Sequence, residues 1–372
     1  MRVLRLYIQD CGVFERTLID FTHQGQEQDI LCISGVNGTG KTTVIELISN
    51  LIHLLDLNIS STDILYDRLK PNILTRVKFA QLDILINEKI ISLVVGDPKE
   101  IQKDEKTKLE QSFIIEPELS SLILEVENTI LKIPEEISQK KVIADWKELK
   151  DEQAFTQRAT EQQNIEHFKP LLKEISQSEN KANLLTDIKK DLPFIYFFNA
   201  HDREIQDIRY DSIPNQKPRY NLVNRYHPKR DDLKKILIYY DYAYPEEFEN
   251  LKIWINHHVL VGKSIEKIDR PNFNVLIKAK NNQYHGLELL SSGEESLLII
   301  ATQIYLKAHK NAIFIIDEID QSLHPEFQQK VIALIKHLQQ EKKCQIIISS
   351  HSKIIWRNFD KKGLIDLTEM VL

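Results

Sequence analysis

The sequence has 372 residues, of which 42% are hydrophobic and 28% are charged, and its formal net charge is −6. A chain of this length and composition can bury a sizeable core, which excludes wholesale disorder and predicts more than one average domain but fewer than three. It contains no uninterrupted apolar stretch long enough to span a membrane, and its mild acidity argues against general adhesion to polyanions.

The three cysteines, Cys11, Cys32 and Cys344, are scattered and form no CxxC pair. This pattern argues against a disulfide framework or a zinc site and fits a reducing compartment. The first ten residues, MRVLRLYIQD, lack the apolar core of a signal peptide. We therefore expect a cytoplasmic protein with no membrane partner.

The first ninety-odd residues are rich in predicted strands. Short apolar runs at 1–7 and 18–21 are followed later by 75–86 and 90–95, which flank a plausible hairpin loop. Between these pairs, 30–34 has the pattern of a buried strand, and 41–55 carries apolar residues at helical spacing. The predicted order is strand, glycine-rich loop and helix.

A phosphate-binding loop is predicted between that strand and that helix. The segment GVNGTGKT at 35–42 satisfies the pattern G-x-x-x-x-G-K-[ST]. Such a loop turns its amide N–H groups toward phosphate oxygens, which requires glycine where a Cβ would block the approach. Lys41 can reach the β- and γ-phosphates, and the Thr42 hydroxyl can ligate Mg²⁺. The predicted nucleotide-binding residues are Gly35, Asn37, Gly38, Thr39, Gly40, Lys41, Thr42 and Thr43.

The middle of the chain is less informative. Residues 98–191 are charged, lack glycine and predict helices broken near prolines, which are either solvated helices packed on the main domain or a partner-binding arm. A buried strand is predicted at 192–199. The segment 217–235 is basic and includes Tyr220 and Tyr226, so it is either a nucleic-acid contact or a solvated loop. A helix at 236–260 and strand–helix units are expected to follow.

Two carboxylates follow a second buried strand. Residues 312–316 form a continuous apolar run, as in a parallel strand covered on both faces. Asp317 and Glu318 would then lie at the carboxyl edge of the sheet, where doubly wound folds bind ligands. We predict that Asp317 holds Mg²⁺ through a water molecule and that Glu318 takes the proton from an attacking water.

A helix beginning at Pro325 and a buried strand at 345–349 come next. This strand–helix–strand crossover would bring Ser349 and His351 to the same sheet edge as the two carboxylates. His351 is therefore a candidate contact for the γ-phosphate, and the predicted catalytic residues are Lys41, Glu318 and His351.

Four segments in this order, GVNGTGKT at 35–42, LSSGEES at 290–296, IFIIDEID at 313–320 and ISSHS at 348–352, resemble the motifs of ABC-type ATPases. The likeness is greatest to the soluble branch that holds the SMC, RecF and OLD-like proteins. LSSGEES is similar to the family's LSGGQ signature, which closes on the ATP of another subunit. The resemblance places Ser291, Ser292, Gly293 and Glu294 in that role in trans, whereas the isolated segment could instead be an ordinary helix cap.

The resemblance implies an α/β fold: a P-loop NTPase with an ABC-ATPase-like mixed sheet, an N-terminal antiparallel β-subdomain and an inserted, largely helical region. The two halves of the ATPase domain would be 1–97 and 286–372, separated by the insertion at 98–191 and a lid or connecting region at 192–285. The family's lid glutamine has two weak candidates, Gln81 and the segment NAHDR at 199–203.

The resemblance also implies the activity and the partners. We expect hydrolysis of ATP with Mg²⁺ as cofactor, in a homodimer or a higher even-numbered oligomer. OLD-like proteins carry a C-terminal nuclease domain, for which the residues after His351 are too few. The layout is similar to the ATPases of Septu-type and PARIS-type anti-phage modules, and this resemblance implies a separate effector protein, a nuclease. The alternative is an SMC- or RecF-like repair ATPase that acts directly on DNA.

Overall fold

The computed structural model describes residues 1–53, 66–67, 70–71, 73, 77–86, 89–96, 193–206, 208–213 and 222–371. The insertion predicted at 98–191 lies outside the described residues, as do Lys217, Arg219 and Tyr220 of the basic segment. Within the described part, no helix is long and apolar enough to cross a membrane.

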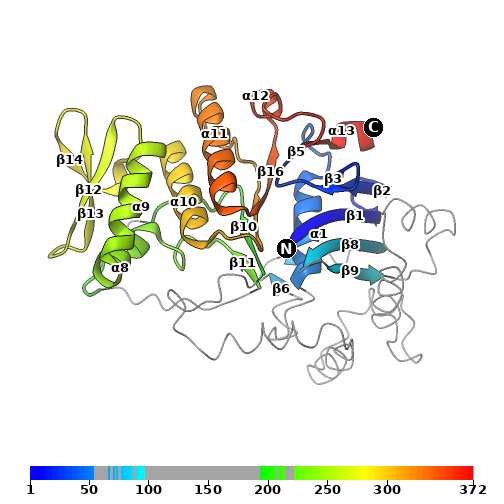
Figure 1. Cartoon of the computed structure of the whole chain (residues 1–372), viewed down its shortest axis with the longest axis horizontal. Helices are drawn as coiled ribbons and strands as arrows, with labels where there is room; N and C mark the ends of the chain where they lie inside the picture. Colours follow the sequence, from blue (N-terminus) through cyan, green and yellow to red (C-terminus); the bar gives the residue numbers. More distant parts are fainter. Residues whose placement is uncertain are drawn as a thin grey trace, which may run out of the picture.

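A six-stranded sheet forms the centre of the fold (Figure 1). Its strands lie in the order β11-β10-β15-β16-β5-β17, and every neighbouring pair is parallel. The strands predicted at 30–34 and 312–316 are confirmed with the same bounds. The strands are β5 (Ile30–Ser34), β10 (Phe194–Phe198), β11 (Val223–Arg225), β15 (Ala312–Ile316), β16 (Gln345–Ser350) and β17 (Leu364–Asp366).

Successive side chains of the central strands enter two different hydrophobic cores. In β15, Ile313 and Ile315 belong to one core, whereas Phe314 and Ile316 belong to the other. All four are fully buried, and each side chain of this size contributes about 1.5–3 kcal/mol by leaving water. Because both faces of the sheet are covered, its strands are apolar throughout instead of alternating with polar residues.

Helices cover both faces of this sheet (Figure 1). Helix α1 (Lys41–His53) packs on one face, and α10 (Ser292–Lys307) and α11 (Pro325–Lys342) pack on the other. The apolar stripe predicted for α1 is buried in the first of these cores. It consists of Val44, Leu47, Ile48, Leu51 and Ile52.

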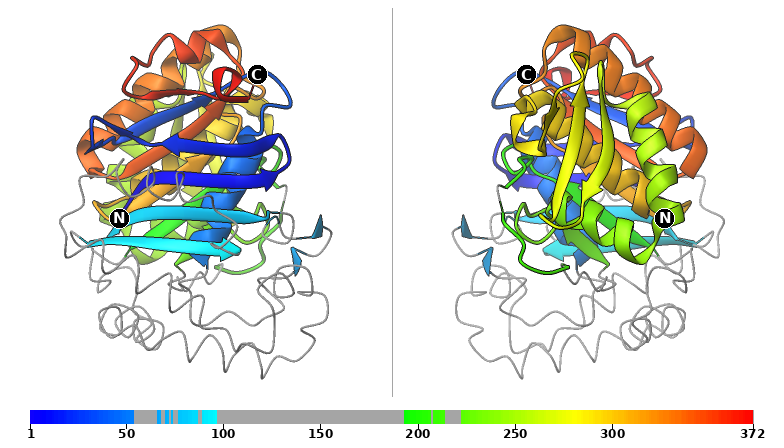
Figure 2. Two further views of the ribbon diagram at one scale, coloured as in Figure 1. Left: turned by 90° about the vertical axis from the view of Figure 1, so that its right-hand side faces the viewer. Right: turned by 90° about the vertical axis from the view of Figure 1, so that its left-hand side faces the viewer.

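A separate antiparallel sheet, in the order β2-β1-β8-β9, lies outside α1 (Figure 2, left). The predicted hairpin is confirmed, because β8 (Phe79–Ile86) and β9 (Lys89–Gly96) pair antiparallel. The other two strands are β1 (Arg2–Cys11) and β2 (Phe14–Asp20). Within this sheet the buried side chains of Arg5 and Asp83 form an ion pair. The predicted antiparallel subdomain is therefore present, although the central sheet itself is parallel.

Two expectations for residues 236–285 are wrong in detail. The region expected to form one helix contains two, α8 (Leu233–Ala243) and α9 (Pro245–His258), because Pro245 starts a new helix. The next segment forms an antiparallel sheet instead of strand–helix units (Figure 2, right). Its strands are β12 (Lys263–Asp269), β13 (Asn274–Ala279) and β14 (Tyr284–His285).

Short elements complete the described fold. They are β3 (Thr22–His23), β4 (Gln26–Glu27), β6 (Tyr66–Asp67), β7 (Lys70–Pro71), the 3-10 helix η3 (Leu287–Leu289), α12 (Lys353–Trp356) and α13 (Leu367–Val371).

All three cysteines are free thiols and buried. Burial raises the pKa of the Cys344 thiol to about 12 and raises that of Cys32 as well.

Candidate active site

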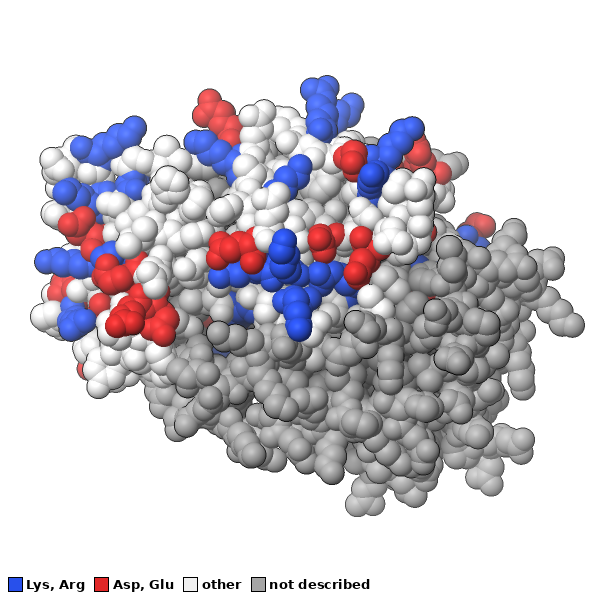
Figure 3. All heavy atoms as spheres, in the orientation of Figure 1, with Lys and Arg blue, Asp and Glu red and all other residues white. Residues whose placement is uncertain are grey.

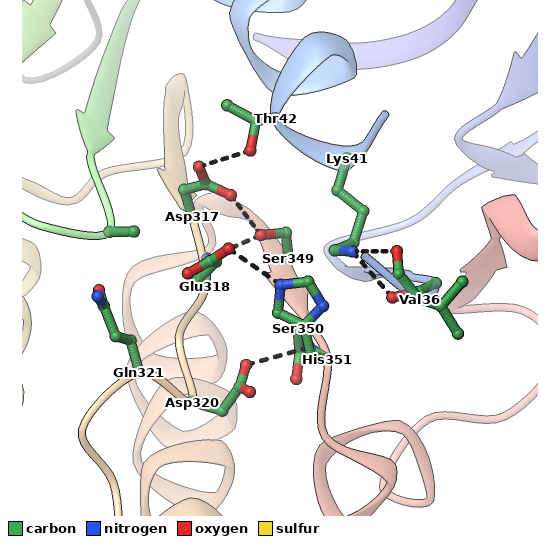
Figure 4. A network of polar contacts seen from close by, with 12 residues as sticks. Val36, Lys41, Thr42, Asp317, Glu318, Asp320, Gln321, Ser349, Ser350 and His351 are labelled. Atoms are coloured by element: carbon green, nitrogen blue, oxygen red, sulfur yellow. Dashed lines mark hydrogen bonds and ion pairs between the residues drawn. The ribbon is translucent and has the colours of Figure 1, made fainter. Parts of the chain in front are cut away.

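The predicted site residues converge at the carboxyl ends of three neighbouring parallel strands (Figure 4). The phosphate loop follows β5, the two carboxylates follow β15, and His351 follows β16. These three strands are adjacent in the sheet, so their loops open at one edge. The structure thus brings together the groups that the sequence placed far apart.

Glycine is required at several points of the phosphate loop. Gly38 and Gly40 have φ of +86° and +87°, in the left-handed region that L side chains rarely adopt. A Cβ on Gly40 would also lie 2.5 Å from the ring of Phe14, whereas one on Gly38 would meet nothing within 4 Å. The loop tip, including Asn37, is exposed, and Thr39 closes the turn by donating to the Val36 carbonyl at 2.9 Å.

The ammonium group of Lys41 points into the phosphate loop (Figure 4). It donates to the carbonyl oxygens of Gly35 at 2.8 Å and Val36 at 3.0 Å. Burial lowers its pKa, while the nearby carboxylates of Glu318 and Asp317 oppose that effect. A phosphate group entering the loop would give this lysine a stronger partner than two neutral carbonyls.

A short chain of hydrogen bonds links the start of α1 to the end of β15. The Thr42 hydroxyl donates to Asp317 Oδ2 at 3.2 Å, and the Ser349 hydroxyl donates to Asp317 Oδ1 at 2.5 Å. A hydroxyl and a carboxylate this close are the hard oxygen ligands that Mg²⁺ prefers. Thr42 and Asp317 therefore fit the metal that the sequence motif implies. Thr43, the next residue of α1, is half-buried.

Glu318 and His351 face each other beside this chain. His351 Nε2 lies 2.9 Å from Glu318 Oε1, and the His351 amide donates to Asp320 Oδ1 at 3.3 Å. Glu318 has φ of +45°, a conformation that costs a residue other than glycine about 1–3 kcal/mol. Its amide donates to Ser349 Oγ at 2.7 Å. The strained backbone is thus held, and the carboxylate is directed toward the imidazole.

The signature segment forms the N-terminus of α10. Ser291 is the N-cap, and its side chain and that of Glu294 form a reciprocal capping box. Ser291 and Ser292 are exposed, whereas Gly293 is buried and faces the carbonyl of Ser322, 3.1 Å from where a Cβ would sit. The helix-cap interpretation is therefore correct for the structure of this segment. The exposed Ser291 hydroxyl is engaged with Glu294, to which it donates at 2.9 Å, whereas Ser292 is exposed beside it.

Glu294 has a second partner that the sequence did not indicate. Lys263 of β12 donates to its Oε2 at 2.8 Å. Burial alone would raise the pKa of Glu294, but the bonds from Lys263 and Ser291 outweigh burial and lower it. Lys263 lies 31 positions away on a strand that was not predicted, so no local pattern could have identified it.

The two candidates for the lid glutamine lie in different parts of the fold. Gln81 lies inside β8 with 4% of its surface exposed, and its amide donates to Asp83 Oδ1 at 2.9 Å. It belongs to the antiparallel sheet. The segment 199–203, in contrast, follows β10 and reaches the acidic strand end, since Arg203 Nη2 donates to the Glu318 carbonyl at 2.8 Å. The structure therefore connects that segment with the site through an arginine instead of a glutamine.

The described part of the basic segment does not form a continuous basic surface. Tyr226 is 2% exposed and stacks on Phe198, so it cannot stack on a nucleobase. Arg225 lies over the ring of Phe197, and Arg230 pairs with Asp231 at 2.9 Å. On the face shown in Figure 3, basic side chains in the middle are flanked by acidic ones. The described part of the segment is not a solvated loop either, because Val223–Arg225 form β11 of the central sheet and Leu233 and Lys234 are buried at the start of α8.

The fold and the site define a P-loop nucleoside triphosphatase, with a phosphate loop, an acidic strand end and a histidine on the neighbouring strand. Residues 1–356 match the family model described as the AAA ATPase domain. Because this match covers most of the chain, the protein belongs to that family and is an ATPase.

Part of the chain is similar to the Septu protein PtuA of Bacillus thuringiensis, with 31% identity over 119 residues. This match spans 28% of the chain and only 29% of that protein. Among solved structures, the SMC head domain from Thermotoga maritima has a TM-score of 0.40 at 13% identity, covering 98% of this chain and 94% of that one. An SMC head bound to the C-winged helix domain of ScpA has a TM-score of 0.44 at 14% identity, with the same coverage.

Proposed function

We propose that this ATPase works as a homodimer that closes around ATP and thereby controls a separate effector in anti-phage defence. The proposal is supported by the position of the signature segment, which lies apart from the other site residues of the same chain. The phosphate loop, Asp317, Glu318 and His351 meet at one sheet edge, while Ser291 and Ser292 are exposed at the start of α10. Among the described residues, no hydrogen bond or ion pair joins the signature segment to the phosphate loop.

Each cis residue has a role that its contacts support. The amides of the phosphate loop and Lys41 bind the β- and γ-phosphates once Lys41 leaves its two backbone carbonyls. Thr42 and Asp317 would hold Mg²⁺, which neutralises phosphate charge when bound. Glu318 accepts the proton of the attacking water, and His351 orients that carboxylate while contacting the γ-phosphate.

The trans role follows from the helix that carries the signature. Helix α10 has 16 residues, and its N-terminal amides and partial positive charge attract an anion. A second copy would present its γ-phosphate to Ser291 and to the Gly293 amide. ADP lacks that group, so hydrolysis and loss of phosphate would weaken the closed dimer.

Dimer closure can be tested by light scattering on size-separated protein. The chain has a mass of 43.5 kDa, so Glu318→Gln with ATP and Mg²⁺ should double that mass, since it binds ATP but hydrolyses it poorly. Adding Ser291→Arg to Glu318→Gln should restore the monomer while nucleotide binding persists. Lys41→Ala should lose nucleotide binding altogether. A monomer in Glu318→Gln under saturating ATP would refute the dimer.

The link to defence is supported by the segment that resembles Septu protein PtuA. We expect the product of a neighbouring gene to be the effector, and the resemblance to these anti-phage modules implies that this product is a nuclease. The test is co-expression with that product and purification through a tag on the ATPase. The effector should stay bound to the Glu318→Gln ATPase in the presence of ATP, and it should dissociate from the wild-type ATPase as ATP is consumed. Equal retention under all nucleotide conditions would refute ATP control of the effector.

Direct action on DNA is the alternative for the same ATPase. Two described basic residues of the segment 217–235 are engaged within the chain, because Arg225 lies over the ring of Phe197 and Arg230 pairs with Asp231. If DNA were the partner, turnover should rise strongly on adding duplex DNA and lose that rise in Arg225→Ala/Arg230→Ala. We expect DNA to leave the rate within about twofold, and a larger, substitution-sensitive stimulation would favour this alternative over effector control.

A further inference from the structure

The conformation of Glu318 needs support from outside its own strand. Its φ of +45° lies in the left-handed region, two residues after the last residue of β15. A glutamate adopts this conformation only where neighbouring groups hold it, and such residues concentrate at functional sites. If the backbone relaxed, the carboxylate would turn away from His351, which lies 2.9 Å from it.

Two side chains hold the Glu318 backbone from opposite sides. On the β16 side, Ser349 Oγ accepts the Glu318 amide at 2.7 Å. On the β10 side, Arg203 Nη2 donates to the Glu318 carbonyl at 2.8 Å. The same carbonyl also accepts the Gln321 amide at 2.9 Å, which closes a turn after the strand. Arg203 is thus a long-range contact of this peptide, 115 positions away in the sequence.

The burial of Arg203 is difficult to explain by stability alone. Only 6% of its surface is exposed, and its Nε and Nη1 have no hydrogen-bond partner among the described residues. An arginine that served only to stabilise the fold would have its donors satisfied, because unpaired buried donors are unfavourable. Its remaining bonds go to the Ala200 carbonyl at 3.3 Å and to Gln321 Oε1 at 3.5 Å, both long.

The guanidinium also contributes positive charge beside the carboxylates. Burial lowers the pKa of Arg203 to about 10, although Asp317, Asp320 and Glu318 oppose this shift. The group therefore stays protonated at neutral pH, next to carboxylates that would otherwise repel one another and an incoming phosphate.

We infer that Arg203 is a positioning residue for ATP hydrolysis, which holds the Glu318 backbone so that its carboxylate faces the reacting water. The inference rests on the proposed role of Glu318 as the base. It gives a function to the segment 199–203, which the sequence could associate with the site only as a possible lid. Arg203 acts through Glu318 and need not touch the nucleotide.

The test compares Arg203→Met and Arg203→Lys with the control Arg209→Met. Arg209 is an exposed arginine just beyond the same segment. Arg203→Met should lower kcat at least tenfold and leave the KM for ATP within about twofold, because the lost contact is a hydrogen bond from a charged donor. Arg203→Lys keeps the charge and one donor, so its kcat should fall about threefold. Arg209→Met should match the wild type.

A double-mutant cycle separates positioning from a general structural role. In the Glu318→Gln background, Arg203→Met should cause no further loss of single-turnover rate, since the base is already absent. An equal loss in both backgrounds, or a kcat for Arg203→Met within twofold of Arg209→Met, would overturn the inference. Should Arg203→Met fail to fold, an undiminished kcat in Arg203→Lys would overturn it equally.

The outcomes also separate this inference from the proposed function. If Glu318→Gln itself keeps normal turnover, Glu318 is not the base, and the positioning role fails with it. If Glu318→Gln is inactive and forms the ATP-bound dimer while Arg203→Met keeps full turnover, only the role of Arg203 fails.

Discussion

Ser349 is expected to be as important for turnover as the residues it contacts. Its hydroxyl accepts the Glu318 amide at 2.7 Å and donates to Asp317 Oδ1 at 2.5 Å, and the residue is fully buried. Ser349→Ala would remove a hydrogen bond to a charged group, worth about 1.5–3 kcal/mol. It would also leave the partly buried Glu318 amide without this partner. The change therefore disturbs both carboxylates at once.

The expected effect on rate follows from this energy. Each 1.4 kcal/mol lost from transition-state stabilisation lowers the rate about tenfold, so loss of the bond to the Asp317 carboxylate alone should lower kcat of Ser349→Ala about 10- to 100-fold. The matched control is Ser350→Ala on the same strand, also fully buried, whose hydroxyl accepts the Ser352 amide at 2.9 Å and contacts neither carboxylate. It should lose about 0.5–1.5 kcal/mol of stability and keep kcat within about threefold.

The assay is steady-state phosphate release at saturating ATP, with melting temperatures measured in parallel. If both alanine variants lose stability but only Ser349→Ala loses turnover, the bonds to the two carboxylates are responsible. Equal kcat in the two variants would refute the reasoning, because the hydroxyl of Ser349 would then contribute to folding alone.

Three further predictions concern ATP binding and stability. Gly40→Ala should abolish ATP binding, because the new Cβ would overlap the ring of Phe14. Gly38→Ala should cost only about 1–2 kcal/mol of backbone strain, because a Cβ there meets nothing within 4 Å. Equal losses of affinity in a nucleotide-binding assay would contradict this difference. Asp83→Asn should lower the free energy of unfolding by about 3–5 kcal/mol, since it removes the negative charge that pairs with the buried Arg5, and denaturant titration would show it. Burial lowers the pKa of Lys307 from 10.5 to about 8, so its charge disfavours the folded state below pH 8. Lys307→Met should therefore raise the melting temperature at pH 7, with a gain that fades between pH 8 and 10.5; a gain equal at every pH would contradict the cause.

Much of the nucleotide-binding half of the fold could be predicted because its signals are local. The strand at 30–34, the phosphate loop and α1 are contiguous, and each follows from spacing and glycine placement. The convergence of Asp317 and His351 could also be predicted, because a parallel crossover brings consecutive strand ends to one edge. These inferences needed no knowledge of distant parts of the chain.

The sheet β12-β13-β14 could not be predicted for a specific structural reason. A register shift between Ile265 and Lys267 interrupts the alternation of β12, so its buried residues Ile265 and Ile268 are three apart, as in a helix. A period-two pattern is absent from the strand that begins the sheet. The irregularity therefore concealed the strand from an analysis based on periodicity.

The contact between Arg203 and Glu318 could not be predicted from the sequence for a different reason. The residue lies past the end of β10, and only the pairing of β10 with β15 brings it to Glu318. That neighbour relation is not encoded in either segment alone, because the two strands are more than a hundred positions apart. Sequence spacing could mark the segment as charged, but only the sheet order gives it a partner.

The burial of every cysteine has a practical consequence for measuring how two copies meet. Cys11, Cys32 and Cys344 are enclosed, so maleimide reagents should leave the wild-type chain unlabelled in its native state. New thiols introduced as Ser292→Cys and Asn37→Cys, both at exposed positions, would then be the reactive sulfurs. Mixing the two single variants with a short bifunctional reagent would yield a covalent pair only when the helix tip of one molecule faces the loop tip of the other.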